Sequence, residues 1–238
     1  MQDHLVQDVK YKNGSYKLAY ITSIQNHPSW YSHFDEANVR ERIWNIQPND
    51  CVLDVGAAYG SYTLTALFQG ASKTYSWSPE AGCGDAKEQT FLKESLRLNG
   101  WQDRGTVYDT GFYNKEGYLD TTTQIFYDKM PSQVPNPDFF IKVSTLDSWY
   151  QDVFLKENDP KSFNKIWMKV DVEGAEVELL NGAKQLITEL KPNITVENHL
   201  FKRGSIKGEV TNFILPLGYI EHSTEPYYSV SHSLYLPK

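Results

Sequence analysis

Short apolar runs that stop at glycine or at a polar residue alternate with segments of helical periodicity along most of the chain. Five runs have the length and composition of buried strands, at residues 51–56, 73–77, 106–113, 165–170 and 193–197. Three segments between them repeat apolar side chains at helical spacing, at residues 62–68, 86–98 and 175–190. Strands that alternate with helices predict an α/β fold, doubly wound around a mostly parallel sheet.

Elements at the two ends of the chain complete this picture. Residues 34–46 predict a helix before the first strand, and residues 210–215 predict a helical turn or two after the last helix. Residues 219–222 and 231–236 read as two further strands. We expect these two strands to form a C-terminal antiparallel hairpin that brings the sheet to seven strands.

Between residues 114 and 159 the alternation loosens. Two extra strands, at 118–126 and 139–143, and a helix at 146–155 are expected in this segment. Its apolar content is too small for a core of its own, so we interpret it as an insertion. The predicted organisation is one domain at residues 49–238 with an insertion around 114–159, preceded by an N-terminal extension or lid at residues 1–48.

Composition and charge exclude several classes of protein. Hydrophobic residues make up 40% and charged residues 22%, which is typical of a globular chain, and the formal net charge is −7. No Lys/Arg run offers the footprint of a nucleic-acid binder, and no segment approaches the ~20 apolar residues of a membrane span. Cys51 and Cys83 form no Cys-x-x-Cys pair, and the N-terminus lacks the features of a signal peptide. We therefore expect a cytoplasmic protein without a membrane span; the oligomeric state is not predicted.

The most informative local pattern is the glycine-rich segment at residues 54–61, DVGAAYGS. Glycine directly after a buried strand allows a sharp turn at the carboxyl edge of the sheet, where ligands bind, although a purely structural turn is the alternative. A dinucleotide-binding fingerprint has three glycines, at the positions that Gly56, Ala58 and Ser61 occupy here. Two of the three glycines are therefore missing. The carboxylate of Asp54 would repel a pyrophosphate and suit a cation. This charge argument favours S-adenosylmethionine, which carries an ammonium and a sulfonium and no phosphate.

Several blocks together resemble the FkbM family of methyltransferases. They are the Asp-x-Gly-x-x-x-Gly segment continuing to residue 63, STLDS at 144–148, KVDVEGAE at 169–176, LNGA at 180–183 and KPNITVE at 191–197. The resemblance covers roughly residue 52 to the C-terminus and implies a Rossmann-like class I methyltransferase fold with S-adenosylmethionine as cofactor. It also implies that Asp54, Gly56, Ala58 and Gly60 surround the methionine part of the cofactor. Tyr62 belongs to the same block and is included among the expected cofactor-binding residues.

The chain departs from the family pattern at the end of the second strand. Family members usually have a glutamate before a proline there, which holds the ribose hydroxyls of the cofactor, whereas this chain has Ser78 before Pro79. A serine makes one hydrogen bond where a carboxylate makes two charge-assisted ones. Either Glu80 or Asp85 supplies the acid from nearby, or the cofactor affinity is weak.

The chemistry of methyl transfer to a hydroxyl points to four further residues. Asp171 and Glu173 follow one predicted strand, and Glu197 and His199 end the next. All four are therefore expected at the carboxyl edge of the sheet, where Gly56 begins its turn. Asp171 is a candidate base or metal ligand, and Glu173 is either a helix cap or part of the site. Our hypothesis is that Asp171 or His199 is the general base. Asp171, Glu173 and Glu197 could gather around Mg²⁺, but no His/Cys spacing suggests zinc, and we expect no obligatory metal.

Three functions remain in competition at this point. The first is an O-methyltransferase that acts on a hydroxyl of a sugar, a glycan or a secondary metabolite, as the resemblance implies. The second is a non-catalytic binding module with a weakened cofactor site, suggested by Ser78. The third is a nucleotide-dependent enzyme of another α/β class, which the missing dinucleotide glycines disfavour. The acceptor is expected to be a small molecule or glycan, whose pocket the insertion and the N-terminal extension would shape.

Overall fold

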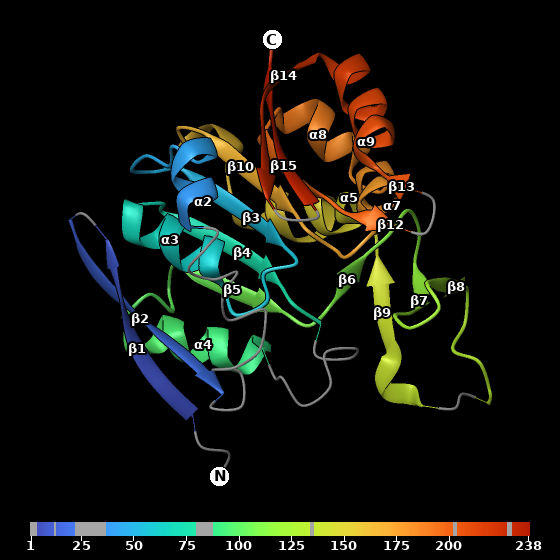
Figure 1. The fold of residues 1–238 in the computed structure, drawn as a ribbon, viewed down its shortest axis with the longest axis horizontal. Helices are drawn as coiled ribbons and strands as arrows, with labels where there is room; N and C mark the ends of the chain where they lie inside the picture. The colour runs from blue at the N-terminus through green and yellow to red at the C-terminus, as the bar shows by residue number, and fades with distance from the viewer. Residues whose placement is uncertain are drawn as a thin grey trace.

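The computed structural model describes residues 4–11, 13–21, 37–79, 88–133, 136–201, 204–227 and 230–238. Figure 1 shows a central sheet with helices on both faces. The α/β class and the mostly parallel large sheet expected from the sequence are confirmed. Within the described ranges, no helix is long and apolar enough to cross a membrane.

The large sheet has the strand order β14-β15-β11-β10-β3-β4-β5. Its strands are β3 (Cys51–Val55), β4 (Lys73–Trp77), β5 (Gly105–Tyr108), β10 (Ile166–Val170), β11 (Asn193–Asn198), β14 (Tyr219–Tyr227) and β15 (Val230–Pro237). β15 runs antiparallel to both of its neighbours, and the remaining pairs from β11 to β5 are parallel. The chain order reverses between β3 and β10, so this pair marks the switch point at which open α/β sheets bind ligands.

Helices cover both faces because the central strands are apolar on both sides. They are α2 (Ala37–Ile43), α3 (Ser61–Gln69), α4 (Glu88–Leu98), α5 (Leu146–Trp149), α6 (Leu155–Glu157), α7 (Glu176–Asn181), α8 (Lys184–Leu190) and α9 (Lys207–Ile214). On one face Leu53 packs into the same cluster as Leu180 of α7 and Val210 of α9. On the other face Val52 packs with Trp44, which follows α2, and with Ala66 of α3. This arrangement holds β3 and β10 in the middle of the molecule.

A hairpin near the N-terminus packs against α3 and α4. It consists of β1 (His4–Tyr11) and β2 (Gly14–Ile21), paired antiparallel. Tyr16 and Leu18 are buried in one cluster with Leu64 and Leu92, and the amide of Ala19 donates to the hydroxyl of Ser95 over 2.8 Å. The hairpin therefore belongs to the packed structure, and its role as a lid stays a prediction.

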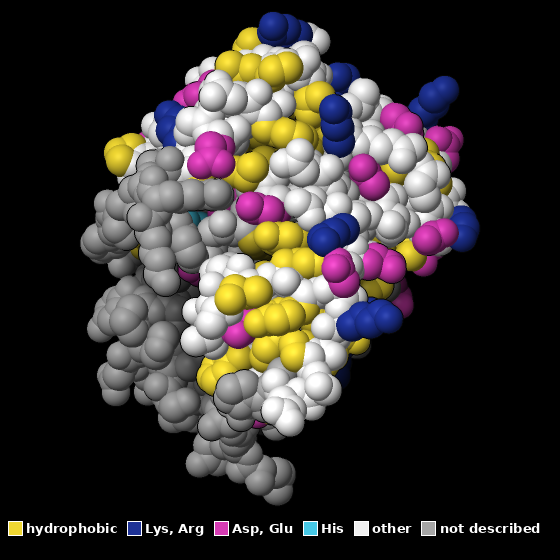
Figure 2. Space-filling view, turned by 90° about the vertical axis from the view of Figure 1, so that its right-hand side faces the viewer, with side chains coloured by type: hydrophobic (Ala, Val, Ile, Leu, Met, Phe, Trp, Pro, Cys, Tyr) yellow, Lys and Arg dark blue, Asp and Glu magenta, His cyan; other side chains and the backbone are white. Residues whose placement is uncertain are grey.

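Residues 111–144 form a second, smaller sheet beside the large one. Its strands are β6 (Gly111–Phe112), β7 (Gly117–Asp120), β8 (Ile125–Tyr127) and β9 (Phe140–Ser144), in the order β6-β9-β7-β8. Figure 2 shows apolar side chains over this part of the molecule, with acidic and basic side chains interspersed around them. Ile125, Met130 and Phe139 are exposed large apolar residues of this sheet and its flank. The domain boundaries at residue 49 and around 114–159 stay predictions.

Three expected elements differ from the structure. Residues 106–113 do not form one strand, because β5 ends at Tyr108 and Gly111–Phe112 pair with β9 in the smaller sheet. Residues 118–126 form the two arms of a hairpin, β7 and β8, rather than one strand. The helix expected at 175–190 is broken into α7 and α8 at Gly182.

The segment after β9 is helical and enters the main core. α5 continues through a π-helical stretch (Tyr150–Phe154) into α6, and single 3-10 turns form at Pro137–Phe139, Pro160–Ser162 and Leu215–Leu217. Trp149 and Phe154 are buried against Tyr75 and Trp77 of β4, with the Trp77 and Trp149 rings 4.7 Å apart and perpendicular. After β11, the short strands β12 (Leu200–Phe201) and β13 (Gly204–Ser205) pair antiparallel.

Candidate active site at the carboxyl edge of the sheet

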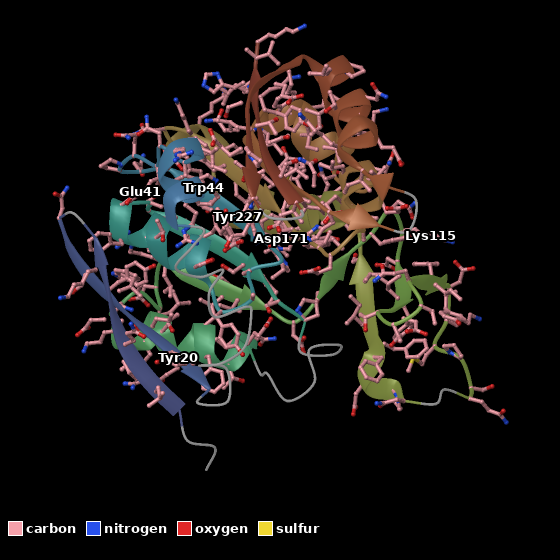
Figure 3. The ribbon with its side chains drawn as sticks, viewed as in Figure 1. Tyr20, Glu41, Trp44, Lys115, Asp171 and Tyr227 are labelled. Carbon is pink, nitrogen blue, oxygen red and sulfur yellow. The ribbon has the colours of Figure 1, made fainter. Side chains whose placement is uncertain are left out.

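The glycine-rich loop after β3 touches the end of β10. Gly56 has a φ of +83°, and a Cβ placed on it would lie 1.6 Å from the backbone oxygen of Asp171. The amides of Gly56 and Ala57 both donate to the backbone oxygen of Trp77, over 3.0 and 2.8 Å. Only glycine allows this approach of two backbones, so the loop and the acidic turn of residues 171–174 form one continuous edge. In the view of Figure 3 Asp171 lies near the centre, with Tyr20 of the hairpin on one side and Lys115, in the bend between β6 and β7, on the other.

Below this edge a row of polar side chains crosses one face of the sheet. Strand register pairs Asp54 with Ser76 on one side and with Lys169 on the other, so these side chains are neighbours. The Nζ atom of Lys169 donates to the backbone oxygen of Gly56 over 2.6 Å and lies 2.9 Å from Asp171 Oδ2 and 3.7 Å from Asp54 Oδ1. Lys169 therefore ties the end of β3 to the end of β10.

Asp54 is fully buried and is held by helix α3. Its Oδ2 atom accepts hydrogen bonds from the amide and the hydroxyl of Thr63, over 3.0 and 2.6 Å. Its Oδ1 atom has no hydrogen-bond partner within the described residues and faces Lys169. A buried carboxylate requires such compensation, so Asp54 fixes the position of the loop whatever else it binds.

A second cluster surrounds His199, which follows β11. The Nδ1 atom of His199 is hydrogen-bonded to Glu176 Oε1 over 2.8 Å. Its Nε2 atom lies 3.4 Å from Glu173 Oε2, 3.7 Å from Asp171 Oδ1 and 3.7 Å from Glu197 Oε1. The sequence placed Asp171, Glu173, Glu197 and His199 at one sheet edge, and in the structure their polar atoms lie within 4 Å of His199 Nε2.

Glu176 and the left-handed backbone of Glu173 shape this cluster. Glu176 is fully buried, and its Oε1 atom also accepts from the amides of Val172 and Gly174, over 3.3 and 3.0 Å. Glu173 has a φ of +54°, which is uncommon for a residue with a side chain and is concentrated at functional sites. Its side chain is 84% exposed, so the carboxylate extends from the edge toward solvent.

Charge interactions in the cluster shift several pKa values. Burial disfavours the charge on His199, but the hydrogen bond that its Nδ1–H donates to Glu176 and the charge of Asp171 outweigh burial and raise the pKa of His199 to about 9. Burial likewise opposes ionisation of Asp171, yet Lys169 and His199 hold its pKa below the ordinary value. Burial lowers the pKa of His232 to about 4, so this neighbour of Glu197 is neutral. At neutral pH the site thus combines an ionised Asp171 with a protonated His199.

The end of β4 supplies the third part of the edge. Ser78 is buried, and its hydroxyl donates to Glu88 Oε2 over 3.3 Å, while its amide donates to the backbone oxygen of Tyr108. Glu88 is the first residue of α4. A carboxylate therefore does lie at this strand end, supplied by a helix rather than by the strand. Glu80 and Asp85, the substitutes suggested by the sequence, lie outside the described residues.

The other expected cofactor residues occupy different environments. Ala58 is exposed at the tip of the loop with a φ of +48°, and Gly60 is buried at the N-terminus of α3 with a φ of +87°. The ring of Tyr62 is buried against Trp44, with the ring centroids 4.8 Å apart and Lys169 Nζ 5.0 Å from the Tyr62 ring. Their contacts with a cofactor stay predictions.

Sequence reasoning missed Lys169, Glu176, Glu88 and His232. Lys169 stood inside an apolar strand, and this was the available signal, because a lysine in a buried strand must be paired. Glu176 is the first residue of α7, where an acid favours the helix N-terminus, and the structure buries it. Glu88 and His232 gave no local signal, since only the folded chain brings them to the site.

A separate cavity of about 340 Å³ lies away from this edge. Its lining includes Ile166 and Asn193, the first residues of β10 and β11, and thus lies at the amino ends of these strands. Ligands of open parallel sheets bind at the carboxyl ends, so the cavity is not the candidate active site.

The family model described as "Methyltransferase FkbM domain" matches residues 54–221. The chain belongs to this FkbM family. The matched span begins at Asp54 and includes both the glycine-rich loop and the His199 cluster. None of the curated proteins compared with the chain matches it.

Solved structures agree with the FkbM assignment at the level of the fold. A methyltransferase FkbM from Methylobacillus flagellatus KT is 20% identical with a TM-score of 0.55, and the match covers 82% of this chain and 46% of that one. A ribosomal protein L11 methylase from Lactobacillus delbrueckii subsp. bulgaricus is 14% identical with a TM-score of 0.50, covering 87% of this chain and 79% of that one. The chain thus spans about half the length of the FkbM structure that it resembles.

Proposed function

We propose that this chain is an S-adenosylmethionine-dependent O-methyltransferase that acts on a hydroxyl of a sugar, a glycan or a secondary metabolite. The observation that carries the proposal is the backbone contact between the glycine-rich loop and the end of β10, at Gly56 and Asp171. A methyl donor held in the loop lies beside groups that can receive the proton of an acceptor. Membership in the FkbM family supports the cofactor and the reaction type.

The residues fit a cationic cofactor. The close backbone contact of Gly56 with Asp171 sets the loop beside an edge that carries an excess of carboxylates. S-adenosylmethionine, when bound, supplies an electrophilic methyl group and leaves as S-adenosylhomocysteine with the electron pair of the broken C–S bond. The acceptor oxygen forms the new O–C bond and releases its proton to the protein.

Among the two candidate bases, the electrostatics favour Asp171. Its pKa lies below the ordinary value, so the carboxylate is ionised and can accept a proton at neutral pH. His199, with a pKa of about 9, already holds its proton and acts as a cation that orients Asp171 and Glu173. Lys169 fixes Asp171 Oδ2 at 2.9 Å and leaves Oδ1 toward His199.

The test is methyl transfer from labelled S-adenosylmethionine to a panel of sugars, glycans and polyols. We expect one class of acceptor to gain a single methyl group, placed on oxygen by NMR of the product. The Asp171→Asn variant should lose about 10²- to 10⁴-fold in turnover with unchanged S-adenosylhomocysteine affinity. Asp152→Asn, at an exposed ion pair with Lys156, is the matched control and should retain full turnover. Methyl groups found on nitrogen or carbon, or normal turnover by Asp171→Asn, would refute the assignment.

A second candidate function follows from Ser78. Its hydroxyl cannot hold two ribose hydroxyls as a strand-end carboxylate does, which favours a binding module with a weakened cofactor site. In that case the native chain has no measurable affinity for S-adenosylhomocysteine and Ser78→Glu restores it. The proximity of Glu88, 3.3 Å from the Ser78 hydroxyl, supports the enzyme instead, because a carboxylate is already present there.

A further inference from the structure

The cluster around His199 has the composition and spacing of a metal site. Asp171, Glu173 and His199 each offer one ligand atom, and these atoms lie within 4.8 Å of one another. His199 Nε2 is 3.4 Å from Glu173 Oε2 and 3.7 Å from Asp171 Oδ1. Neighbouring ligand atoms around an octahedral divalent ion are about 3 Å apart, since each bond is about 2.1 Å long. The two distances from His199 Nε2 exceed this spacing by about 0.4 and 0.7 Å, so side-chain shifts of less than 1 Å would bring the histidine and the two acids into coordination distance.

Glu176 gives the histidine the orientation that a metal ligand requires. Metal-binding histidines donate their other ring N–H to a carboxylate or carbonyl, which fixes the tautomer and aims the free nitrogen at the ion. His199 Nδ1 has this partner in Glu176 Oε1 at 2.8 Å, so Nε2 faces Asp171 and Glu173. On binding, the ion replaces the proton that His199 carries at neutral pH. Glu176 is itself fixed by two backbone amides of the 171–174 turn. One buried carboxylate thus holds both the histidine and the turn that carries the acids.

Two buried polar atoms beside the cluster have no hydrogen-bond partner within the described part of the chain. They are Glu176 Oε2, in a fully buried residue, and His232 Nε2, whose side chain is 3% exposed and which lies 3.9 Å from Glu197 Oε2. Such atoms are rare in buried positions and need a physical explanation. Both adjoin the His199 cluster, where they are consistent with a group that binds there.

The charges around the cluster point to a cation. Five carboxylates lie within 4 Å of Lys169 or His199, so even two positive side chains leave an excess of negative charge. These carboxylates belong to Asp54, Asp171, Glu173, Glu176 and Glu197. Close carboxylates repel one another unless a cation lies between them, and a divalent ion supplies the missing charge.

We propose that Asp171, Glu173 and His199 bind a divalent transition-metal cation such as Mn²⁺. Two carboxylates and one imidazole suit Mn²⁺ better than Mg²⁺ or Ca²⁺, which prefer oxygen ligands alone. The exposed Glu173 leaves the solvent side of the ion open to an acceptor. With the ion bound, Asp171 would act as its ligand, and the ion would promote deprotonation of the acceptor by lowering the pKa of its hydroxyl. This role rests on the proposed methyl transfer, whereas the binding itself does not.

The test is a titration of the chain, stripped with EDTA and dialysed, with Mn²⁺, in which EPR detects the free ion. We expect one ion bound per chain, with Mg²⁺ competing only at large excess. Glu173→Gln should weaken binding at least tenfold, and because this side chain is exposed the variant folds normally, as circular dichroism can verify. Glu176→Gln should cost about 10- to 100-fold through the loss of the oriented histidine. Asp152→Asn is the control and should bind like the native chain.

No saturable Mn²⁺ binding by the folded native chain, or equal binding by Glu173→Gln, overturns the proposal. Turnover measured in EDTA separates this result from the proposed function. Methyl transfer that persists without any metal would leave the enzyme assignment standing and overturn the proposed role of the ion in the reaction. Mn²⁺ binding without methyl transfer to any acceptor would confirm the site and contradict the proposed reaction.

Discussion

Replacing Lys169 with methionine tests how the site is held together. Lys169 compensates two carboxylates, the fully buried Asp54 at 3.7 Å and the partly buried Asp171 at 2.9 Å. Breaking a buried ion pair from one side costs about 3–5 kcal/mol, because the other charge stays buried without a partner. The hydrogen bond from Lys169 to the backbone of Gly56 is lost at the same time. We therefore expect Lys169→Met to lower the free energy of unfolding by about 4 kcal/mol.

The assay is urea unfolding followed by far-UV circular dichroism in EDTA. With an m-value of about 2.5 kcal/mol/M, a loss of about 4 kcal/mol lowers the midpoint by about 1.6 M. Lys156→Met removes an exposed partner of Asp152, a pair worth about 0.3–0.5 kcal/mol, and should shift the midpoint by about 0.2 M. The double variant Lys169→Met/Asp54→Asn should recover part of the loss, because it removes an uncompensated buried charge. Equal shifts for Lys169→Met and Lys156→Met would refute the reasoning.

Three further predictions concern the loop, the strand end and the response to pH. Gly56→Ala should destabilise the chain by at least about 2 kcal/mol more than Gly100→Ala in urea unfolding, since both glycines have a positive φ but nothing lies within 4 Å of a Cβ at Gly100. Glu88→Gln should weaken S-adenosylhomocysteine binding about tenfold by calorimetry, as expected for the loss of a charge-assisted hydrogen bond, whereas Glu94→Gln on the same helix should not. The pKa of His232 is about 4 in the folded chain and about 6.5 in the unfolded chain, so its contribution to stability is present above pH 6.5 and is lost as the pH falls. Between pH 7 and pH 5, the free energy of unfolding of the native chain should therefore fall by about 2 kcal/mol more than that of His232→Gln.

Each of these predictions has an outcome that contradicts it. Equal destabilisation by the two alanine substitutions would mean that the edge tolerates a side chain at Gly56. Unchanged affinity of Glu88→Gln would return the ribose-binding role to Ser78 or to residues outside the described ranges. Parallel acid titrations of native chain and His232→Gln would show that this histidine charges without cost.

The central strands could be predicted from the sequence because they are buried on both faces. Parallel strands covered by helices read as continuous apolar runs, and β3, β4, β10 and β11 match the predicted runs to within one residue or so. The same logic put Asp171 and His199 at one edge, since the carboxyl ends of parallel strands lie together. Their common position therefore followed from the fold class alone.

The elements that were predicted incorrectly depend on contacts between distant segments. The run at 106–113 is divided because Gly111 pairs with Val143 in the smaller sheet, which no local pattern reveals. The helix at 175–190 breaks because Gly182 packs against the backbone of Tyr113 and the carboxylate of Asp147 accepts from two amides at the start of α8. The apolar spacing continues through the break, so periodicity alone predicts one helix.

The compensating residues of the site were also beyond local patterns. Lys169 lies within an otherwise apolar strand, and the sequence does not show its partners. The strand register identifies one of them, because it places Lys169 beside Asp54. Glu88 reaches Ser78 from a helix that follows the strand by about ten residues, replacing a carboxylate expected on the strand itself. A charged residue in a buried run is thus the signal that deserved greater weight.

The central claim is that the carboxyl edge of β3, β4 and β10 binds S-adenosylmethionine. The most direct measurement is a calorimetric titration of the purified native chain with S-adenosylhomocysteine, beside a parallel titration with NAD. We predict saturable binding of S-adenosylhomocysteine at one site per chain and none of NAD. Binding of NAD alone, or of neither ligand by the folded chain, would contradict the account.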